Sequence, residues 1–83
     1  MQVRVRLFGS LRERAGRAEL RLELPAGATA EAAWSALVAS SPELASRRPS
    51  LAVAVNREYA AFETRLNEDD EVVFIPPVSG GLS

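Results

Sequence analysis

The feature that most constrains the fold is the apolar segment at residues 71–75, Glu-Val-Val-Phe-Ile. The segment is apolar on both of the faces that a strand presents, which is typical of a strand in the middle of a sheet. Pro76 and Pro77 follow it, and neither can donate a hydrogen bond to a neighbouring strand, so the strand must end there. We therefore expect a sheet with residues 71–75 at its centre.

Two further segments, residues 2–8 and 17–24, alternate between apolar and polar side chains. Such alternation predicts two strands, each with one buried side, that pair as a hairpin. The polar sequence between them ends in Gly16 and predicts a single helical turn closed by that glycine. The side chains expected to face the core are Val3, Val5, Leu7, Ala18, Leu20, Leu22 and Leu24.

The segment that follows Pro25 predicts the main helix. Thr29 is a suitable N-cap, and Glu31 in the first turn is favoured by the helix dipole. Apolar residues then recur at helical spacing, which predicts one face packed on the sheet. These residues are Ala30, Ala33, Trp34, Leu37 and Val38. Pro42 ends the helix region, and residues 42–50 are expected to form a loop.

Residues 51–55, Leu-Ala-Val-Ala-Val, predict a third long strand, and a short strand is expected at residues 59–62. An acidic run follows at residues 68–71. It lacks the spacing and the glycine of a calcium-binding loop, so we interpret it as a turn that leads into the last strand.

These elements occur in the order strand, strand, helix, strand, short strand, strand. The order predicts an α+β fold of the β-grasp (ubiquitin-like) type, a mixed sheet of about five strands with one main helix packed on one face. In this fold the last strand lies parallel to the first. At 83 residues the chain is long enough for one domain. We expect the β-grasp domain at residues 1–76 and a flexible C-terminal tail at residues 77–83.

Composition excludes much of the chemistry that enzymes use. The sequence has no Cys and no His, so it offers no thiol nucleophile, imidazole base or usual transition-metal ligand. Its glycines lack the spacing of a phosphate-binding loop. A net charge of −1 gives no general attraction to nucleic acid or anionic lipid. No signal-peptide pattern and no long apolar run is visible. We expect a cytoplasmic protein without metal or cofactor that catalyses no reaction alone.

Gly80 and Gly81 raise a separate question, because glycine costs ordering entropy and adds no packing. Residues 77–81 can extend about 17 Å beyond the last strand. A tip without side chains can enter a channel too narrow for any Cβ atom. The alternative is an ordinary frayed terminus, where glycine and serine are common.

Three stretches carry a resemblance to one family: VRLFGSLRERAG, VAVNREYA and LNEDDEVVFIPPVSGG. The chain resembles the ubiquitin-like sulfur carriers, and among them the small subunits of molybdopterin synthase. The resemblance implies a β-grasp fold and a non-catalytic role as sulfur donor within a heterotetrameric synthase. It implies three partners: the large synthase subunit, an ATP-dependent activating (adenylating) enzyme and a sulfurtransferase.

The resemblance also implies roles for the two glycines. The Gly81 carboxylate is adenylated and thiocarboxylated, and its sulfur goes to cyclic pyranopterin monophosphate in molybdenum cofactor biosynthesis. Gly80 and Gly81 enter a channel of the large subunit, which holds the catalytic pocket, and ATP is used by the activating enzyme. Leu82 and Ser83 depart from the family pattern. Three explanations stay open for these two residues. A protease removes them, the chain is a relative of the family that carries no sulfur, or they are an artificial addition.

A docking surface near the tail is needed to offset the cost of ordering it. The candidates are Phe8, which faces away from the buried side of its strand, and Val73 or Phe74 beside it, with Pro76 and Pro77. Core packing is the alternative for these side chains. Three other functions stay open: a thiamine-type sulfur carrier, a ubiquitin-like protein modifier, and an interaction module that does not use its glycines.

Overall fold

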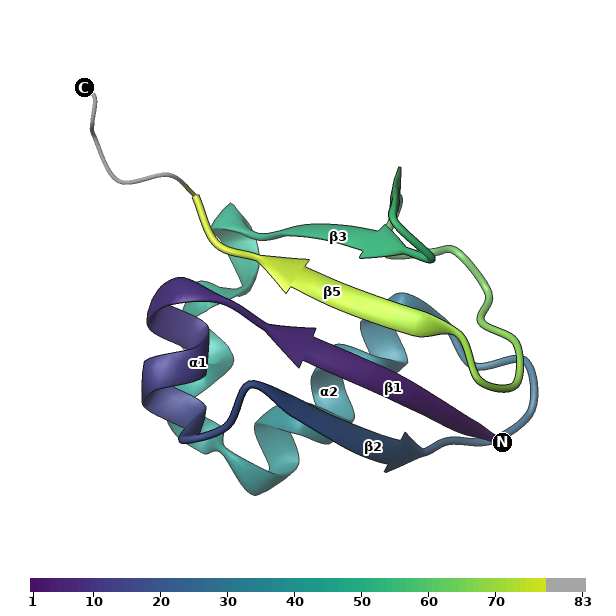
Figure 1. Cartoon of the computed structure of the whole chain (residues 1–83), viewed down its shortest axis with the longest axis horizontal. Coiled ribbons are helices and arrows are strands. Elements are labelled where there is room, and N and C mark those ends of the chain that lie inside the picture. The colour runs from purple at the N-terminus through teal and green to yellow at the C-terminus, as the bar shows by residue number, and fades with distance from the viewer. Residues whose placement is uncertain (78–83) are drawn as a thin grey trace.

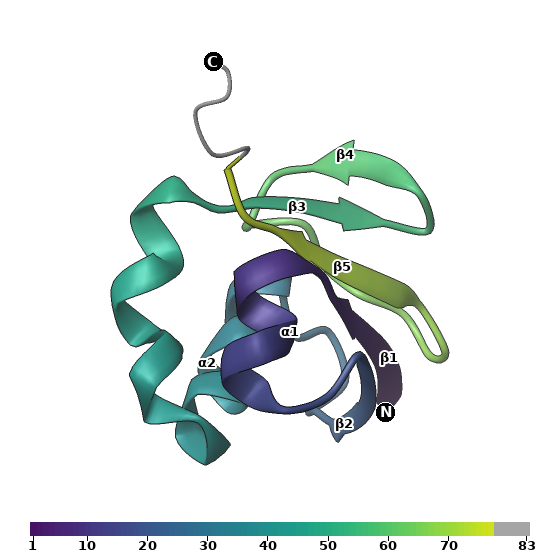
Figure 2. The ribbon, with the colours of Figure 1, turned by 60° about the vertical axis from the view of Figure 1, so that its left-hand side comes forward.

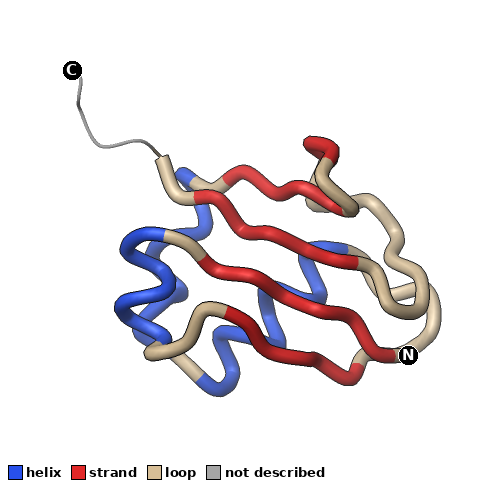
Figure 3. Tube along the Cα trace, viewed as in Figure 1, coloured by secondary structure: helices blue, strands red, loops and turns tan. Residues whose placement is uncertain are grey.

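The computed structural model describes residues 1–77, which form a five-stranded sheet and three helices (Figures 1 and 3). The strands are β1 (Gln2–Leu7), β2 (Glu19–Glu23), β3 (Ala52–Val55), β4 (Glu58–Ala60) and β5 (Glu71–Ile75). The helices are α1 (Gly9–Ala15), α2 (Ala30–Ser40) and the 3₁₀ helix η1 (Pro42–Ser50). The predicted β-grasp arrangement is confirmed.

The last strand, β5, lies at the centre of the sheet, whose strand order is β2-β1-β5-β3-β4. It pairs in parallel with β1, where Arg4 lies opposite Glu71, and antiparallel with β3, where Val53 lies opposite Phe74. Because β5 has a neighbour on each side, its backbone N–H and C=O groups can form hydrogen bonds with a strand at both of its edges. The expectation drawn from the apolar segment is therefore confirmed, including the parallel pairing with the first strand.

The three helices lie on one side of the sheet, and no helix of residues 1–77 covers the other side (Figure 2). None of these helices is long and apolar enough to cross a membrane. Side chains from both layers fill the core between them. The largest wholly buried ones are Val3, Val5, Leu7, Leu11, Leu37, Leu44, Val53, Val72 and Phe74.

Two aromatic contacts centre on Phe74. The Trp34 ring meets it edge to face with centroids 5.1 Å apart, and the Phe62 ring stacks on it at 6.2 Å. The guanidinium of Arg48 covers Phe62, 3.5 Å from its ring centroid, and donates two hydrogen bonds to Oε1 of Glu31. Trp34 is thus a core residue, and Arg48 connects η1 to both the core and α2.

The prediction of a loop at residues 42–50 was wrong. The backbone N–H of Leu44 donates to the Ser41 carbonyl over 3.0 Å, and the Leu44 side chain is fully buried. This apolar anchor and the Arg48 contacts hold the segment in helical turns despite its two prolines and polar composition. The polar composition of the segment led to the prediction of a loop. Composition does not show that its one leucine, Leu44, is buried in the core.

Smaller differences concern the first hairpin. Helix α1 has seven residues rather than a single turn, although it ends as predicted at Gly16, whose φ is 78°. Ala18 is exposed, and Leu20 and Leu22 are only partly buried. Their strand, β2, lies at the edge of the sheet and is only partly covered, so alternation predicted more burial than the edge provides.

We predict that Phe74→Ala lowers the free energy of unfolding by about 3–5 kcal/mol, because it removes the ring that Trp34 and Phe62 both contact and leaves a cavity. Urea unfolding followed by Trp34 fluorescence measures this loss. Tyr59→Ala is the matched control, because Tyr59 is 79% exposed and its loss should cost under about 1 kcal/mol. Equal losses in the two variants would contradict the placement of Phe74.

Candidate functional site

The face of the sheet that the helices leave uncovered, here called the open face, is the candidate site. Since alternate residues of a strand point to opposite sides, the buried residues of β1 and β5 leave Arg4, Arg6 and Val73 on this face. Register adds Glu19, Arg21 and Glu23 on β2, Glu71 and Ile75 on β5, Ala52 and Ala54 on β3, and Tyr59 on β4. The face is therefore charged on β2 and β1, and beyond Glu71 it is apolar on β5, β3 and β4.

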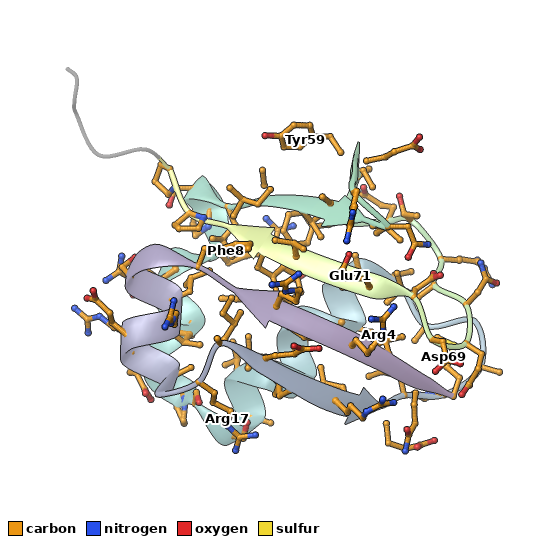
Figure 4. All side chains as sticks on the ribbon, in the orientation of Figure 1. Arg4, Phe8, Arg17, Tyr59, Asp69 and Glu71 are labelled. Atoms are coloured by element: carbon orange, nitrogen blue, oxygen red, sulfur yellow. The ribbon has the colours of Figure 1, made fainter. Side chains whose placement is uncertain are left out.

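The apolar part of the open face lies beside the end of β5, and we call it the apolar patch. Its members are Phe8, Ala52, Ala54, Tyr59, Val73 and Ile75. Phe8 is 45% exposed, and Tyr59 projects from β4 at the far edge of the sheet (Figure 4). Exposed aromatic side chains beside smaller apolar ones are typical of a surface that another protein covers.

The predicted docking residues divide between this patch and the core. Phe8 and Val73 lie on the open face, as proposed from the sequence. Phe74 is 0% exposed and points to the helices, so its proposal as a docking residue is corrected. The alternation that places Val73 outward forces its neighbour inward. Pro76 is partly buried and Pro77 is exposed.

Sequence reasoning missed Tyr59 and Ile75 as members of the patch. Ile75 is two positions from Val73 in the same strand, so alternation alone was sufficient to identify it. Alternation alone could not identify Tyr59. It belongs to the patch because it pairs with Ala54, which in turn pairs with Val73. That signal is the register of two hairpin strands, which the sequence does not fix.

The end of β5 meets the start of α1 at the edge of the apolar patch. Gly9 has φ +55°, a left-handed conformation that glycine adopts without strain, and it turns the chain sharply after Phe8. A Cβ at Gly9 would lie 3.5 Å from Cγ of Pro76, so the two segments are in close contact. The predicted functional glycines, Gly80 and Gly81, lie outside the described residues.

A buried carboxylate with two arginines borders the apolar patch. Glu71 is 7% exposed; its Oε2 accepts a hydrogen bond from Nη1 of Arg6 over 3.3 Å, and its Oε1 lies 3.6 Å from Nε of Arg57. The Arg6 guanidinium also lies 5.8 Å from the centre of the Phe8 ring. At another corner of the face, a hydrogen bond from the Met1 ammonium holds the pKa of Glu23 below its usual value.

The turn between β3 and β4 positions both Tyr59 and Arg57. Asn56 and Arg57 have φ of 51° and 73°, the left-handed pair that a two-residue hairpin turn requires. The Asn56 side chain fixes this turn, because its Nδ2 donates to Oδ1 of Asp70 over 2.9 Å and its Oδ1 accepts from the Glu71 N–H over 3.0 Å. The hairpin is thereby attached to the start of β5.

The acidic run forms the predicted turn at residues 68–70, and its last residue, Glu71, begins β5. Glu68 accepts from the backbone N–H of Gln2, and Asp70 accepts from the N–H of Asn67 and from the Asn56 amide. Within residues 1–77 no group of acidic side chains is placed to hold a metal, and no pocket opens. Among the described residues, the open face therefore stays the candidate site.

The chain resembles known proteins over nearly its whole length. Residues 5–81 match the ThiS family. A protein of Arabidopsis thaliana called a molybdopterin synthase sulfur carrier subunit is 35% identical over 98% of this chain and 84% of its own length. A protein of the same name from Chlamydomonas reinhardtii is 39% identical over 98% of this chain and 100% of its own length.

Solved structures share the same fold. The crystal structure of SAMP1 from Haloferax volcanii superimposes with a TM-score of 0.90 and 34% identity, covering 98% of this chain and 100% of SAMP1. One chain in a complex of subunits 1 and 2 of the molybdopterin-converting factor of Helicobacter pylori superimposes with a TM-score of 0.68, covering 98% of this chain and all of that one. At 22% identity, the second similarity concerns the fold alone.

We predict that Asn56→Ala lowers the free energy of unfolding by about 2–3 kcal/mol. It removes two hydrogen bonds to partly buried groups and places alanine in a left-handed conformation. Asn56→Gly is the matched variant, because it loses the same hydrogen bonds but accepts the backbone conformation and should lose less stability. Thermal unfolding of both variants measures the difference, and no loss in either would contradict the role of the Asn56 side chain.

Proposed function

Because the chain belongs to the ThiS family, we propose that it is the sulfur-carrier subunit of a molybdopterin synthase. The observation that carries the proposal is the extent of the family match, which runs through β5 to Gly81. The two named relatives support the synthase in particular, since each is identical at a third or more of the aligned positions over nearly all of this chain. A cytoplasmic location follows from this role as part of the proposal.

The proposed chemistry takes place at the Gly81 carboxylate. A carboxylate is a poor electrophile, so the activating enzyme uses ATP to convert it to an acyl adenylate, which has AMP as a good leaving group. The terminal persulfide sulfur of the sulfurtransferase displaces AMP and forms an acyl disulfide with Gly81. A thiol reductant then attacks the cysteine sulfur of that S–S bond, which leaves a disulfide between the reductant and the sulfurtransferase and releases the thiocarboxylate on Gly81. That sulfur is ionised and nucleophilic, and it attacks cyclic pyranopterin monophosphate. Two rounds supply the two sulfurs of the dithiolene that later binds molybdenum.

The catalytic pocket in this proposal belongs to the large subunit, and this chain supplies the sulfur and the docking surface. Ordering four or five tail residues costs about 1–2 kcal/mol each, so contacts elsewhere must offset several kcal/mol. The apolar patch is suited to this task, because it adjoins the point where the chain leaves the sheet at Pro76. The two relatives that are called subunits of molybdopterin synthase support a large-subunit partner, which we expect in a two-fold heterotetramer.

Protein modification is the second candidate function. The observation that favours it is the TM-score of 0.90 with SAMP1, since a second structure of that protein is called small archaeal modifier protein 1. Both functions use an activated Gly81 carboxylate, but a modifier passes it to a lysine amine of a target protein. A thiamine-type carrier would deliver the same sulfur to a different acceptor. The product formed from an activated chain distinguishes the three.

We predict that the chain gains sulfur only when it ends at Gly81. Leu82 and Ser83 move the reactive carboxylate about 7 Å further along the tail, and a misplacement of about 1 Å can cost on the order of 100-fold in rate. The full-length chain and a chain ending at Gly81 are incubated separately with activating enzyme, ATP and a sulfur source. Only the shorter chain should gain the mass of an oxygen-to-sulfur exchange. The same gain by untrimmed full-length protein would contradict this account of the tail.

We also predict that Phe8→Arg and Tyr59→Arg each weaken binding to the large subunit by at least about tenfold, because a desolvated apolar contact is replaced by a buried charge. Calorimetric titration of the chain ending at Gly81 measures the affinity. Both side chains are exposed, so the melting temperature should stay close to that of the wild type. Arg17→Ala, on an exposed loop away from the patch, is the control (Figure 4). Unchanged affinity in both arginine variants would exclude the patch as the docking surface.

A further inference from the structure

We propose that Arg57 and Arg6, bridged by the Glu71 carboxylate, bind an acidic side chain of the large synthase subunit that covers the apolar patch. This inference rests on the proposed function and adds the chemistry of the partner. Each arginine meets a different oxygen of Glu71, at 3.3 Å for Arg6 and 3.6 Å for Arg57. One buried negative charge is thus shared by two cations, which leaves an excess of one positive charge at this border of the patch.

Within residues 1–77, Glu71 is the acidic side chain in ion-pair contact with these two arginines, and the Asp70 carboxylate instead accepts hydrogen bonds from the Asn56 amide and the Asn67 N–H. Arg4, two positions before Arg6 on β1, is itself a cation. Its guanidinium donates to the Asp69 backbone carbonyl, which carries no net charge, so Arg4 does not reduce the positive excess. Glu19 lies opposite Arg6 in register, but within residues 1–77 the ion pair that Arg6 forms is with Glu71. Glu58 precedes Tyr59 in β4 and therefore points to the other side of the sheet.

Before a partner arrives, Arg6 is restrained at its guanidinium and Arg57 at its backbone. Arg6 is restrained by Glu71 and by the Phe8 ring. Arg57 is held less tightly, because its side chain is 84% exposed, but its backbone is fixed in the turn that Asn56 attaches to β5. Each guanidinium carries five N–H donors, and the contacts with Glu71 use few of them. Groups that are already ordered lose little conformational freedom on binding.

The backbone at Arg57 gives an independent reason to assign a role to its side chain. At φ 73° the second position of this turn is one where glycine fits without strain and arginine does not. Asn-Gly is the sequence preferred for such a turn. An arginine here costs local stability, and its long side chain reaches the border of the apolar patch.

A protein carboxylate suits this site better than a small anion. No pocket opens in residues 1–77, so a free phosphate or nucleotide would find no enclosing walls. The site is continuous with the apolar patch through the contact of Arg6 with Phe8. A partner surface that covers the patch therefore meets the two arginines at its rim, where an Asp or Glu can accept hydrogen bonds from both.

The test compares Arg57→Gly with Arg17→Gly in chains ending at Gly81. Both variants remove one exposed arginine and change net charge equally, and Arg57→Gly creates the favoured Asn-Gly turn, so the fold is preserved. Affinity for the large synthase subunit is measured by calorimetry at about 0.05 M and about 0.5 M salt. At low salt Arg57→Gly should bind about two- to fivefold more weakly than wild type. Arg57→Glu should bind more than about tenfold more weakly.

High salt should reduce the difference between wild type and Arg57→Gly, since screening removes the contribution of the exposed charge. Arg6→Met, which keeps an apolar contact with Phe8, should show the same salt-dependent loss. Equal affinities of the wild type, Arg57→Gly and Arg17→Gly at low salt would overturn the inference, and so would a loss that salt does not change. Neither of these two results would contradict the proposed sulfur transfer by the wild-type chain. If the wild-type chain neither binds the large subunit nor gains sulfur, the proposed function fails as well.

Discussion

The parallel pairing of β1 with β5 determines which segments meet at each edge of the sheet. Because the two strands run in the same direction, their carboxyl ends lie together at one edge of the sheet. Gly9, which follows β1 and Phe8, therefore lies against Pro76, which follows β5. An antiparallel arrangement of the same two strands would place the aromatic ring at the opposite edge from the tail. The apolar patch and Pro76, where the chain leaves the sheet, adjoin each other because of this one pairing.

The second organising feature is the difference between the two faces of the sheet. On the covered face Phe74 joins Trp34 and Phe62 in the core, while on the open face its neighbours Val73 and Ile75 lie in the apolar patch. A strand of five residues thus carries both the centre of the core and the centre of the candidate binding surface. Phe74→Ala is therefore expected to affect folding, whereas a replacement of Val73 or Ile75 changes the surface of the apolar patch.

Much of the fold follows from the sequence, because its signals are local. The alternation around Val5 identified β1, and the Thr29 cap identified the start of α2, where its oxygen accepts from the N–H of Ala32. The 3₁₀ helix η1 was missed because its order comes from distant partners: Leu44 in the core, and Arg48 on Phe62 and Glu31. The candidate site shows the same division. Phe8 and Val73 were identified from alternation, whereas Tyr59 and the bridge at Glu71 depend on the register of strands that are far apart in the chain.

The central position of β5 also has a kinetic consequence. The Arg6–Glu71 contact joins residues 65 positions apart, so the middle of the sheet closes only when nearly the whole described chain is available. Pairings of such high sequence separation are slow to form, because loop-closure entropy must be overcome first. During synthesis on a ribosome, the edges of β1 and β3 that later pair with β5 would stay unpaired until β5 emerges from the exit tunnel. The open face and the core would then be completed in the same late step, because both depend on the arrival of β5 between its two neighbours.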